Sequence, residues 1–263
     1  ATVSDSLDSI SPFTTAGPKM AALKPIAATA DVRTLWSFSA GKAGDFSFSP
    51  AVVGNAVFVA AADGTVNKLE DGKSVWKIKA GQPLSAGVGA NNRLVVVGTS
   101  KGEVLAAPTV GDQGVAVKSG DNRVFLLDAS DGGRKWVYQR STPPLSIRSA
   151  GSPVFADQYI FVGFPGGKLV ALSIQNGAPV WEGAVALPKG ATELDRVADI
   201  VAPPVVDGRQ VCAVAFQGRV ACFDMGQGGA MIWSRDLSSA TGLALDGRYL
   251  FVTDDKGAVH ALD

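Results

Sequence analysis

The amino-acid sequence predicts an all-β fold, a β-propeller built from four-stranded blades. Two observations predict it. A tight turn followed by an alternating apolar strand recurs six times along the 263 residues, and all five tryptophans fall at one position of this repeat. With a strand before each turn, one near a Ser-Pro or Pro-Pro pair and one that carries tryptophan, each unit contains four strands. Four strands in roughly 40–45 residues is the length of a propeller blade.

The six turns define the units in chain order. In each turn a Gly or Asn supplies the positive φ that a tight hairpin requires, and an apolar strand such as YIFVGF precedes it. We interpret residues 31–263 as a single propeller domain and residues 1–30, rich in Ala, Ser, Thr and Pro, as a flexible tether. The turn residues are Gly64, Gly102, Asn122, Gly167, Gly218 and Gly257.

The second unit is too short for a blade. Asn122 follows Gly102 by 20 residues, about half a repeat, so we expect about half a blade to be missing near residues 102–106. Either the segment is deleted or the printed sequence omits it; we favour omission, because a blade without its outer strand exposes unpaired backbone groups. The sixth unit stops after its third strand. Either the strand around Trp36 completes a ring of six, or further blades follow.

The tryptophans close the strand that follows each hairpin, as in DGGRKW and NGAPVW. Trp36 has no hairpin before it and is interpreted as an orphan fourth strand. We expect this column to be structural, since large aromatic side chains at a fixed place of every unit suit a packed core. Its members are Trp36, Trp76, Trp136, Trp181 and Trp233.

The composition argues against several classes of protein. Apolar residues make up 46% of the chain and charged residues 18%, which allows a sizeable core. Lys+Arg and Asp+Glu both number 24, so a basic nucleic-acid surface or a polybasic membrane patch is not expected. No apolar run approaches the ~18 residues of a membrane-spanning helix. The first ten residues, ATVSDSLDSI, lack the basic start and apolar middle of a signal peptide.

Few side chains point to catalysis. His260 is the only histidine, in a slot that other repeats fill with Asn, Phe, Val or Ala, so catalytic triads and histidine-rich metal sites are not expected. Cys212 and Cys222 flank one turn on paired strands. We favour two separate buried side chains, with a disulfide as the alternative. The sequence contains no phosphate-binding glycine loop and no metal-spaced cysteine set, and we predict neither cofactor nor metal.

Two long connections, residues 139–152 and roughly 185–202, interrupt the repeat. Each joins the outer strand of one blade to the inner strand of the next, so both should lie on one rim over adjacent blades. Apolar anchors beside an arginine are the composition of an interface centre, and binding residues concentrate in loops on rigid scaffolds. The candidate partner-binding residues are Leu145, Ile147 and Arg148 in the first connection and Asp195, Arg196 and Asp199 in the second.

Two other interpretations of these connections stay open. Leu145 and Ile147 could simply extend the inner strand while Arg148 pairs with a loop carboxylate. Glu193 and its acidic neighbours could form a metal or acid–base site, although loop charges are usually only solvated.

These residues resemble a known family. The repeat ALD…G…W is similar to that of pyrroloquinoline-quinone-type propellers, whose blades lock through the repeated tryptophan. The stretches LSIRSAGSPVF, GATELDRVADIVAPPVV, FQGRVACFD and WSRDLSS resemble the BamB family, the lipoprotein subunit of the β-barrel assembly machinery in the Gram-negative outer membrane. The similarity runs from about Trp36 to Asp263 and is strong from residue 140 onward.

The resemblance implies an eight-bladed, non-enzymatic periplasmic propeller, tethered by a lipid on an N-terminal cysteine, that binds the barrel-forming subunit of the machinery. Leu145, Ile147 and Arg148 match the family's Leu-Ser-Leu-Arg contact for that subunit. Asp199 matches the first acid of its Asp-x-Asp motif, whereas Val201 replaces the second. The chain also departs from the family in having no N-terminal cysteine and only six visible units.

We therefore predict a scaffold at the periplasmic face of the outer membrane. Its partners would be the barrel-forming subunit and unfolded outer-membrane proteins, the latter pairing with an exposed blade edge by β-augmentation. No nucleic acid is expected, and the membrane is reached only through an N-terminal lipid not present in this chain. The alternatives are a quinone-dependent dehydrogenase, which short length and the lack of adjacent cysteines disfavour, and a ligand-sensing propeller.

Overall fold

The computed structural model describes residues 33–46, 48–92, 94–99, 109–141, 143, 145–147, 151–188, 190–194 and 196–263. Backbone contacts divide the chain into the units Ala1–Leu35 and Trp36–Asp263. All strands described below belong to the second unit, in which each sheet is antiparallel and its strands pair in chain order.

Four sheets have the predicted four strands. The first contains β1 (Ala51–Val53), β2 (Ala56–Ala60), β3 (Thr65–Glu70) and β4 (Lys73–Lys79). The third contains β7 (Thr109–Gly111), β8 (Gly114–Lys118), β9 (Val124–Leu127) and β10 (Arg134–Tyr138). The fourth contains β11 (Val154–Ala156), β12 (Tyr159–Phe164), β13 (Lys168–Ser173) and β14 (Pro179–Ala184). The fifth contains β15 (Val205–Asp207), β16 (Gln210–Val214), β17 (Arg219–Asp224) and β18 (Ala230–Asp236), with a 3₁₀ turn, η1 (Met225–Gln227), before β18.

Two sheets are smaller within the described residues. The second consists of β5 (Leu84–Ala90) and β6 (Val95–Thr99), and the sixth of β19 (Leu243–Asp246), β20 (Tyr249–Thr253) and β21 (Val259–Leu262). Gly102 and the predicted half-blade gap lie outside the described residues. The sixth sheet ends at its third strand, as the sequence indicated.

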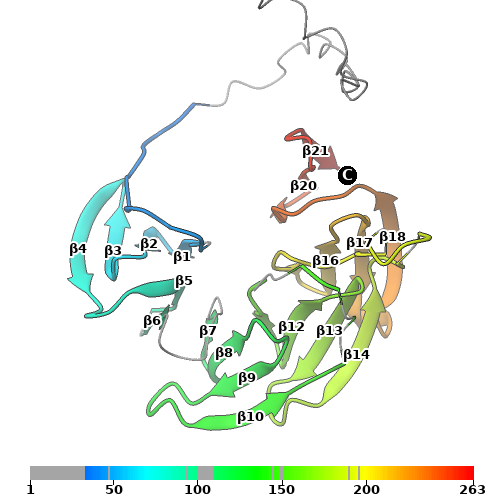
Figure 1. The fold of residues 1–263 in the computed structure, drawn as a ribbon, viewed down its shortest axis with the longest axis horizontal. Coiled ribbons are helices and arrows are strands. Elements are labelled where there is room, and N and C mark those ends of the chain that lie inside the picture. Colours follow the sequence, from blue (N-terminus) through cyan, green and yellow to red (C-terminus); the bar gives the residue numbers. More distant parts are fainter. Residues whose placement is uncertain are drawn as a thin grey trace, which may run out of the picture. The chain divides into compact units, whose positions relative to one another are not determined.

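The sheets follow one another in chain order (Figure 1). The first strand of each sheet contacts the first strand of the next, from β1 to β5, β7, β11, β15 and β19. This arrangement of four-stranded sheets joined side by side through their first strands is that of a β-propeller, as predicted.

The hairpin turns between second and third strands lie where the sequence placed them, with one difference in detail. Gly64, Asn122 and Gly257 have positive φ, at 87°, 62° and 83°. At the fifth turn Gln217 has the positive φ, 49°, and Gly218 does not. Gly218 is needed for space instead, because a Cβ there would lie 2.7 Å from the Ala186 Cβ.

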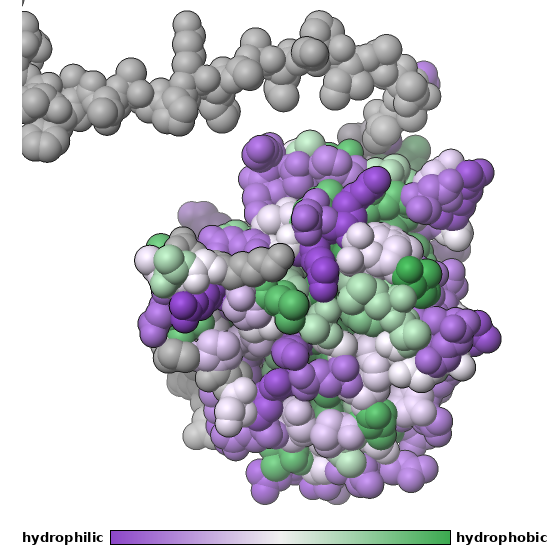
Figure 2. Space-filling view, turned by 90° about the vertical axis from the view of Figure 1, so that its right-hand side faces the viewer, coloured by the Kyte–Doolittle hydropathy of each residue, from purple (hydrophilic) through white to green (hydrophobic). Residues whose placement is uncertain are grey.

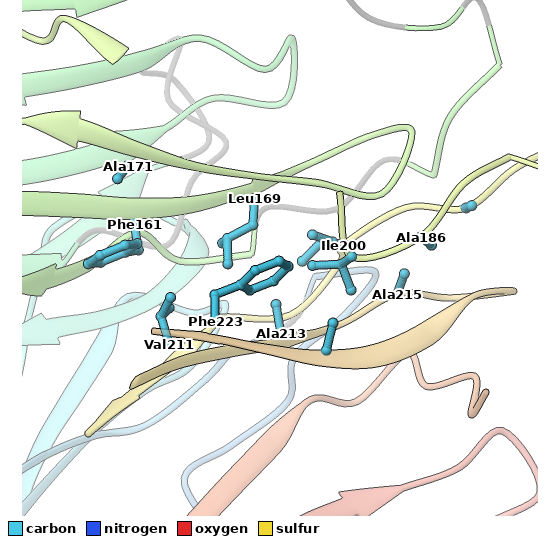
Figure 3. Packing of buried hydrophobic residues seen from close by; sticks show 12 residues of the cluster. Phe161, Leu169, Ala171, Ala186, Ile200, Val211, Ala213, Ala215 and Phe223 are labelled. Atoms are coloured by element: carbon cyan, nitrogen blue, oxygen red, sulfur yellow. The ribbon is translucent and has the colours of Figure 1, made fainter. Parts of the chain in front are cut away.

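The core lies between neighbouring sheets. Figure 3 shows the cluster between the fourth and fifth sheets, in which Phe161 and Leu169 face Val211 and Phe223, and Ile200 is inserted toward Ala215. Ile200 comes from the long connection between β14 and β15. By contrast, the side of the molecule that carries β18 shows hydrophobic residues scattered among hydrophilic ones (Figure 2).

Two members of the tryptophan column, Trp136 and Trp181, pack across sheet boundaries. The indole Nε1 of Trp136 donates to the Ile174 carbonyl at 2.8 Å, and a Cβ on Gly177 of the fourth sheet would lie 2.6 Å from the Trp136 ring. Trp181 packs in the same way against Gly229 of the fifth sheet and lies edge-on to Phe223, with ring centroids 5.0 Å apart.

Trp36 also packs against a glycine, although it is not part of a strand. Residues 33–40 pair with no sheet, so the structure does not show Trp36 completing a ring of six. Its side chain lies instead against Gly72, where a Cβ would come within 2.7 Å of the Trp36 ring. Trp76 lies 5.9 Å from Phe58, and Trp233 lies opposite Cys222.

Cys212 and Cys222 form a disulfide. The favoured expectation of two separate side chains was wrong. The two residues face each other directly on β16 and β17, with Cα atoms 4.1 Å apart, close to the ~4.5 Å of a non-hydrogen-bonded antiparallel pair. A count outward from the turn could not decide the register to a single residue.

Candidate docking site

The candidate site lies where the two long connections, residues 139–152 and 185–202, meet the turns of the fourth and fifth sheets. The connection after β14 begins against the β12–β13 turn, with the Val185 amide donating to the Gly167 carbonyl at 2.8 Å. It then crosses to the fifth sheet, where the Phe216 amide donates to the Asp199 carbonyl at 2.9 Å. This connection therefore lies over two adjacent blades, as its length suggested.

Asp199 joins this connection to the one that follows β10. Its side chain is 2% exposed. One carboxylate oxygen, Oδ2, accepts from the Ile147 amide at 2.6 Å, and Oδ1 accepts from the Gly166 amide at 2.9 Å. The structure thus brings Ile147 and Asp199 together as the sequence predicted, but the carboxylate faces inward and binds backbone.

The other predicted partner-binding residues are placed only in part. Leu145 is 42% exposed and Ile147 is half-buried. Arg196 is exposed, and its Nε donates to the Gly190 carbonyl at 3.0 Å. Arg148 and Asp195 lie outside the described residues.

Sequence reasoning missed two exposed leucines in the second connection. Leu187 is 58% exposed and Leu194 is 67% exposed. Both stand in the irregular stretch ALPKGATELD, where bulky apolar residues have no strand to complete. With Leu145 they give the two connections three exposed leucines. A single exposed leucine is ordinary, and only a contiguous apolar patch marks an interface.

A buried lysine beneath the connections was also missed. Lys118 ends β8 and is 1% exposed; its Nζ donates to the Gly163 carbonyl at 2.7 Å and lies 5.1 Å from the centre of the Phe164 ring. Burial lowers its pKa to about 8, against the opposing effect of the Asp199 charge. One signal was available: the position four residues before the turn residue is uncharged in the other units, where it holds Ala60, Gly98, Gly163, Val214 and Thr253.

The first connection is also fixed at its start. Arg140 donates to Glu182 of β14 at 2.9 Å, and its guanidinium lies 5.4 Å from the Phe164 ring centre. Lys168 pairs with the same carboxylate at 3.1 Å. Burial raises the pKa of Glu182, but the hydrogen bonds from Lys168 and Arg140 outweigh it, so this pKa is lowered.

The only histidine of the chain pairs with a carboxylate of the turn before its strand, β21. The His260 Nε2 lies 2.8 Å from Asp254 Oδ2, and the other carboxylate oxygen of Asp254 accepts from the Lys256 and Ala258 amides. Across the described ranges, no three His, Cys, Asp or Glu side chains are grouped as metal ligands would be. The same part of the chain holds no helix of the length and apolarity that a bilayer crossing requires.

Comparison with known proteins gives a consistent result. The model of a family described as "Outer membrane protein assembly factor BamB" matches residues 26–263. The protein of that name from Bordetella pertussis is 39% identical over 264 residues, covering 92% of this chain and 68% of the relative. The chain thus spans about two thirds of that relative's length.

Solved structures agree on the fold. The crystal structure of BamB from Moraxella catarrhalis is similar with a TM-score of 0.73 and 25% identity, covering 83% of this chain and 72% of that one. Quinohemoprotein alcohol dehydrogenase from Comamonas testosteroni has a TM-score of 0.52 at 14% identity, over 85% of this chain and 42% of the enzyme. That second likeness shows the fold alone.

Proposed function

The chain belongs to the family of the outer membrane protein assembly factor BamB, and we propose that it is a non-enzymatic scaffold that docks the barrel-forming subunit of the outer-membrane assembly machinery. It would act at the periplasmic face of the outer membrane. Unfolded outer-membrane proteins are the second partner we propose, paired along an exposed blade edge.

One observation carries the docking part of this proposal. Two connections that are far apart in sequence are joined by the hydrogen bond from the Ile147 amide to Asp199. The two connections carry exposed Leu145 and Leu194 and the exposed, charged Arg196. Apolar anchors fixed in place and bordered by charge suit a protein interface, because little ordering entropy is lost on binding.

The resemblance of the first connection to the family's contact supports the same partner. Leu145, Ile147 and Arg148 match the Leu-Ser-Leu-Arg pattern, and Arg148 is proposed to bind an acidic group of the barrel-forming subunit. We propose that Asp199 acts indirectly, by holding the backbone of the first connection, since its carboxylate already accepts hydrogen bonds from backbone amides. By the same resemblance we propose eight blades and an N-terminal lipid anchor for the full-length protein.

Binding to the purified periplasmic region of the barrel-forming subunit, measured by isothermal titration calorimetry, tests this function. Leu145→Asp and Arg148→Glu should each weaken binding by roughly 30-fold or more, the effect of losing a hot-spot residue worth about 2 kcal/mol. Both variants should melt within a few degrees of the parent protein.

Val137→Asp is the matched control. Val137 lies on β10 and is 45% exposed, close to the 42% of Leu145, but it is outside both connections. It should bind like the parent protein. Normal binding by both Leu145→Asp and Arg148→Glu would refute the docking site, and unfolding of Arg148→Glu would assign that arginine to a structural ion pair.

A further inference from the structure

A pocket opens between the fourth and fifth sheets, at the strand ends opposite to the two long connections. Its empty volume is about 530 Å³, which lies within the range of small-ligand sites. Its lining comes from β11, β12 and β15, from the turns that follow β11 and β15, and from η1. Because consecutive strands of a sheet are antiparallel, these turns lie at one end of the sheets and the connections between sheets at the other.

The corresponding place at the preceding boundary is filled by a ring of the protein itself. Phe155 on β11 and Val206 on β15 are each the second residue of the first strand of their sheet. A Cβ on Gly111 of the third sheet would lie 2.9 Å from the Phe155 ring, so that ring lies directly against the third sheet. At the next boundary the smaller Val206 takes this position, and the large side chains, Tyr159 and Phe161, come from the fourth sheet instead. This exchange leaves the pocket open beside Val206.

The walls of the pocket are of the kinds that attract an aromatic ring. Tyr159 and Phe161 lie edge-on to each other, with ring centroids 6.2 Å apart, and a further ring gains offset or edge-on contact with such a pair. Met225 adds a thioether and Arg209 a guanidinium, both of which interact favourably with aromatic rings. An aliphatic side chain would gain only from the burial of its surface. The lining therefore favours an aromatic ligand.

Several of these walls are held in place by the fold. The Tyr159 hydroxyl accepts from Gln158 Nε2 at 2.9 Å. Arg209 donates from Nη2 to Asp224 at 2.9 Å, and its carbonyl accepts from the Met225 amide at 2.8 Å. A site that is already ordered loses little entropy when a ligand binds. Because the Arg209 charge is paired with Asp224, the pocket is not expected to select an anion.

A carboxylate at the pocket can accept hydrogen bonds from a ligand. Asp157 lines the pocket from the β11–β12 turn and is exposed. Among the residues that the structure describes, none donates a hydrogen bond to this carboxylate and no cation pairs with it. A carboxylate is an acceptor only, so it suits a ligand with N–H groups next to its ring, as a peptide backbone has.

We propose that this pocket binds an aromatic side chain of a polypeptide, with the ring beside Val206 and a backbone N–H donated to Asp157. The proposal does not depend on the docking site, which lies at the opposite ends of the strands. It gives the scaffold a second binding site, selective for a type of side chain.

NMR of the whole chain with ¹³C-labelled methionine methyl groups tests the proposal, with N-acetyl-L-phenylalaninamide as the probe. The Met225 methyl signal should shift with a Kd of about 1 mM, the affinity reached by well-placed ligands of this size. N-acetyl-L-leucinamide should bind about fivefold more weakly, because it lacks the ring. Met231 is not part of the lining, and its methyl signal is the internal reference that should not move.

Val206→Phe should weaken binding of the probe by about tenfold or more, because the added ring occupies the pocket. Val52→Phe is the matched control. Val52 is the second residue of β1, is 68% exposed and does not line the pocket, so this variant should bind like the parent protein. Should Val206→Phe fail to fold, Asp157→Gly replaces it, because the φ of 51° at Asp157 suits glycine. Loss of one ordinary hydrogen bond should then weaken binding about fivefold.

Three results would overturn the proposal. The pocket is not a binding site if the Met225 methyl signal stays in place at about ten times the expected Kd, or if folded Val206→Phe binds like the parent protein. Equal affinity for the phenylalanine and leucine derivatives would exclude selection of an aromatic ring. Tighter binding of free L-phenylalanine than of the blocked amide would assign the pocket to a free amino acid in place of a polypeptide. The docking site is tested with a different ligand, so none of these results bears on it.

Discussion

Asp199 is a surface-loop residue by sequence and a buried structural acceptor in the fold. The difference arises because the carboxylate turns toward two backbone amides that have no strand partner. Those of Ile147 and Gly166 both donate to it. Both amides are part-buried, and an amide that is shielded from water and left unpaired destabilises the fold.

Asp199→Ala should therefore lower the free energy of unfolding by about 2–5 kcal/mol. Two part-buried amides, those of Ile147 and Gly166, lose their acceptor, at about 1–3 kcal/mol each. Urea denaturation followed by tryptophan fluorescence measures the change. Asp207→Ala is the control: Asp207 is exposed at the end of β15, and its removal should change the stability by less than about 0.5 kcal/mol. Equal midpoints for the two variants would contradict the anchoring role.

Lys118 and Asp199 also show which features of single residues could not be predicted from the sequence. The spacing of the long connections was enough to predict that Ile147 and Asp199 lie near each other. It could not give the direction of the Asp199 carboxylate, because irregular backbone has no periodicity that fixes which side chains face inward. Lys118 was overlooked because its partner, the Gly163 carbonyl, lies 45 residues away on another sheet.

At the scale of the elements, prediction worked best for the hairpins. Gly64, Asn122 and Gly257 were located because a tight turn needs positive φ and few residues adopt it readily. Packing between sheets was harder to predict. Gly218 is required by the closeness of Ala186, and Gly177 by the Trp136 ring, and neither neighbour is close in sequence.

Gly177→Ala should destabilise the protein by about 2 kcal/mol more than Gly208→Ala. Both glycines have positive φ, 72° and 54°, so both variants carry the same backbone cost, about 1 kcal/mol. Only at Gly177 does the added methyl group collide with an indole; at Gly208 nothing lies within 4 Å. Overpacking of this kind typically costs 1–3 kcal/mol.

Thermal melts of the two glycine variants provide the measurement. The free energy of unfolding of Gly208→Ala should lie within about 1 kcal/mol of that of the parent protein. If the two variants melt together, tryptophan docking against the next sheet contributes little to stability, and the role assigned to the Trp136 contact would have to be abandoned.

At the scale of the whole molecule, Lys118 makes stability depend on pH. Its pKa is about 8 in the folded protein and 10.5 ordinarily, so between these values the unfolded chain binds more protons than the folded one. The free energy of unfolding therefore rises with pH from about 8 to about 10. Compared with Lys118→Met, the parent protein should gain roughly 2–3 kcal/mol across this window, at about 1.4 kcal/mol per pKa unit. Guanidinium denaturation of both proteins at pH 7, 8.5 and 10 measures the difference, and a constant difference would show that Lys118 titrates normally.

The contact of Trp136 and of Trp181 with a glycine of the following sheet has a consequence for cooperativity. Trp136 of the third sheet lies against Gly177 of the fourth, and Trp181 of the fourth against Gly229 of the fifth. Each of these contacts joins only two neighbouring sheets. The stability of such a molecule can be described as a sum of terms for single sheets and for the boundaries between neighbours, as in a one-dimensional Ising model. Loss of one contact would then not weaken all sheets evenly. It would weaken that boundary first, so the tryptophan contacts, together with the core shared by neighbouring sheets, help to set the size of the unit that unfolds at once.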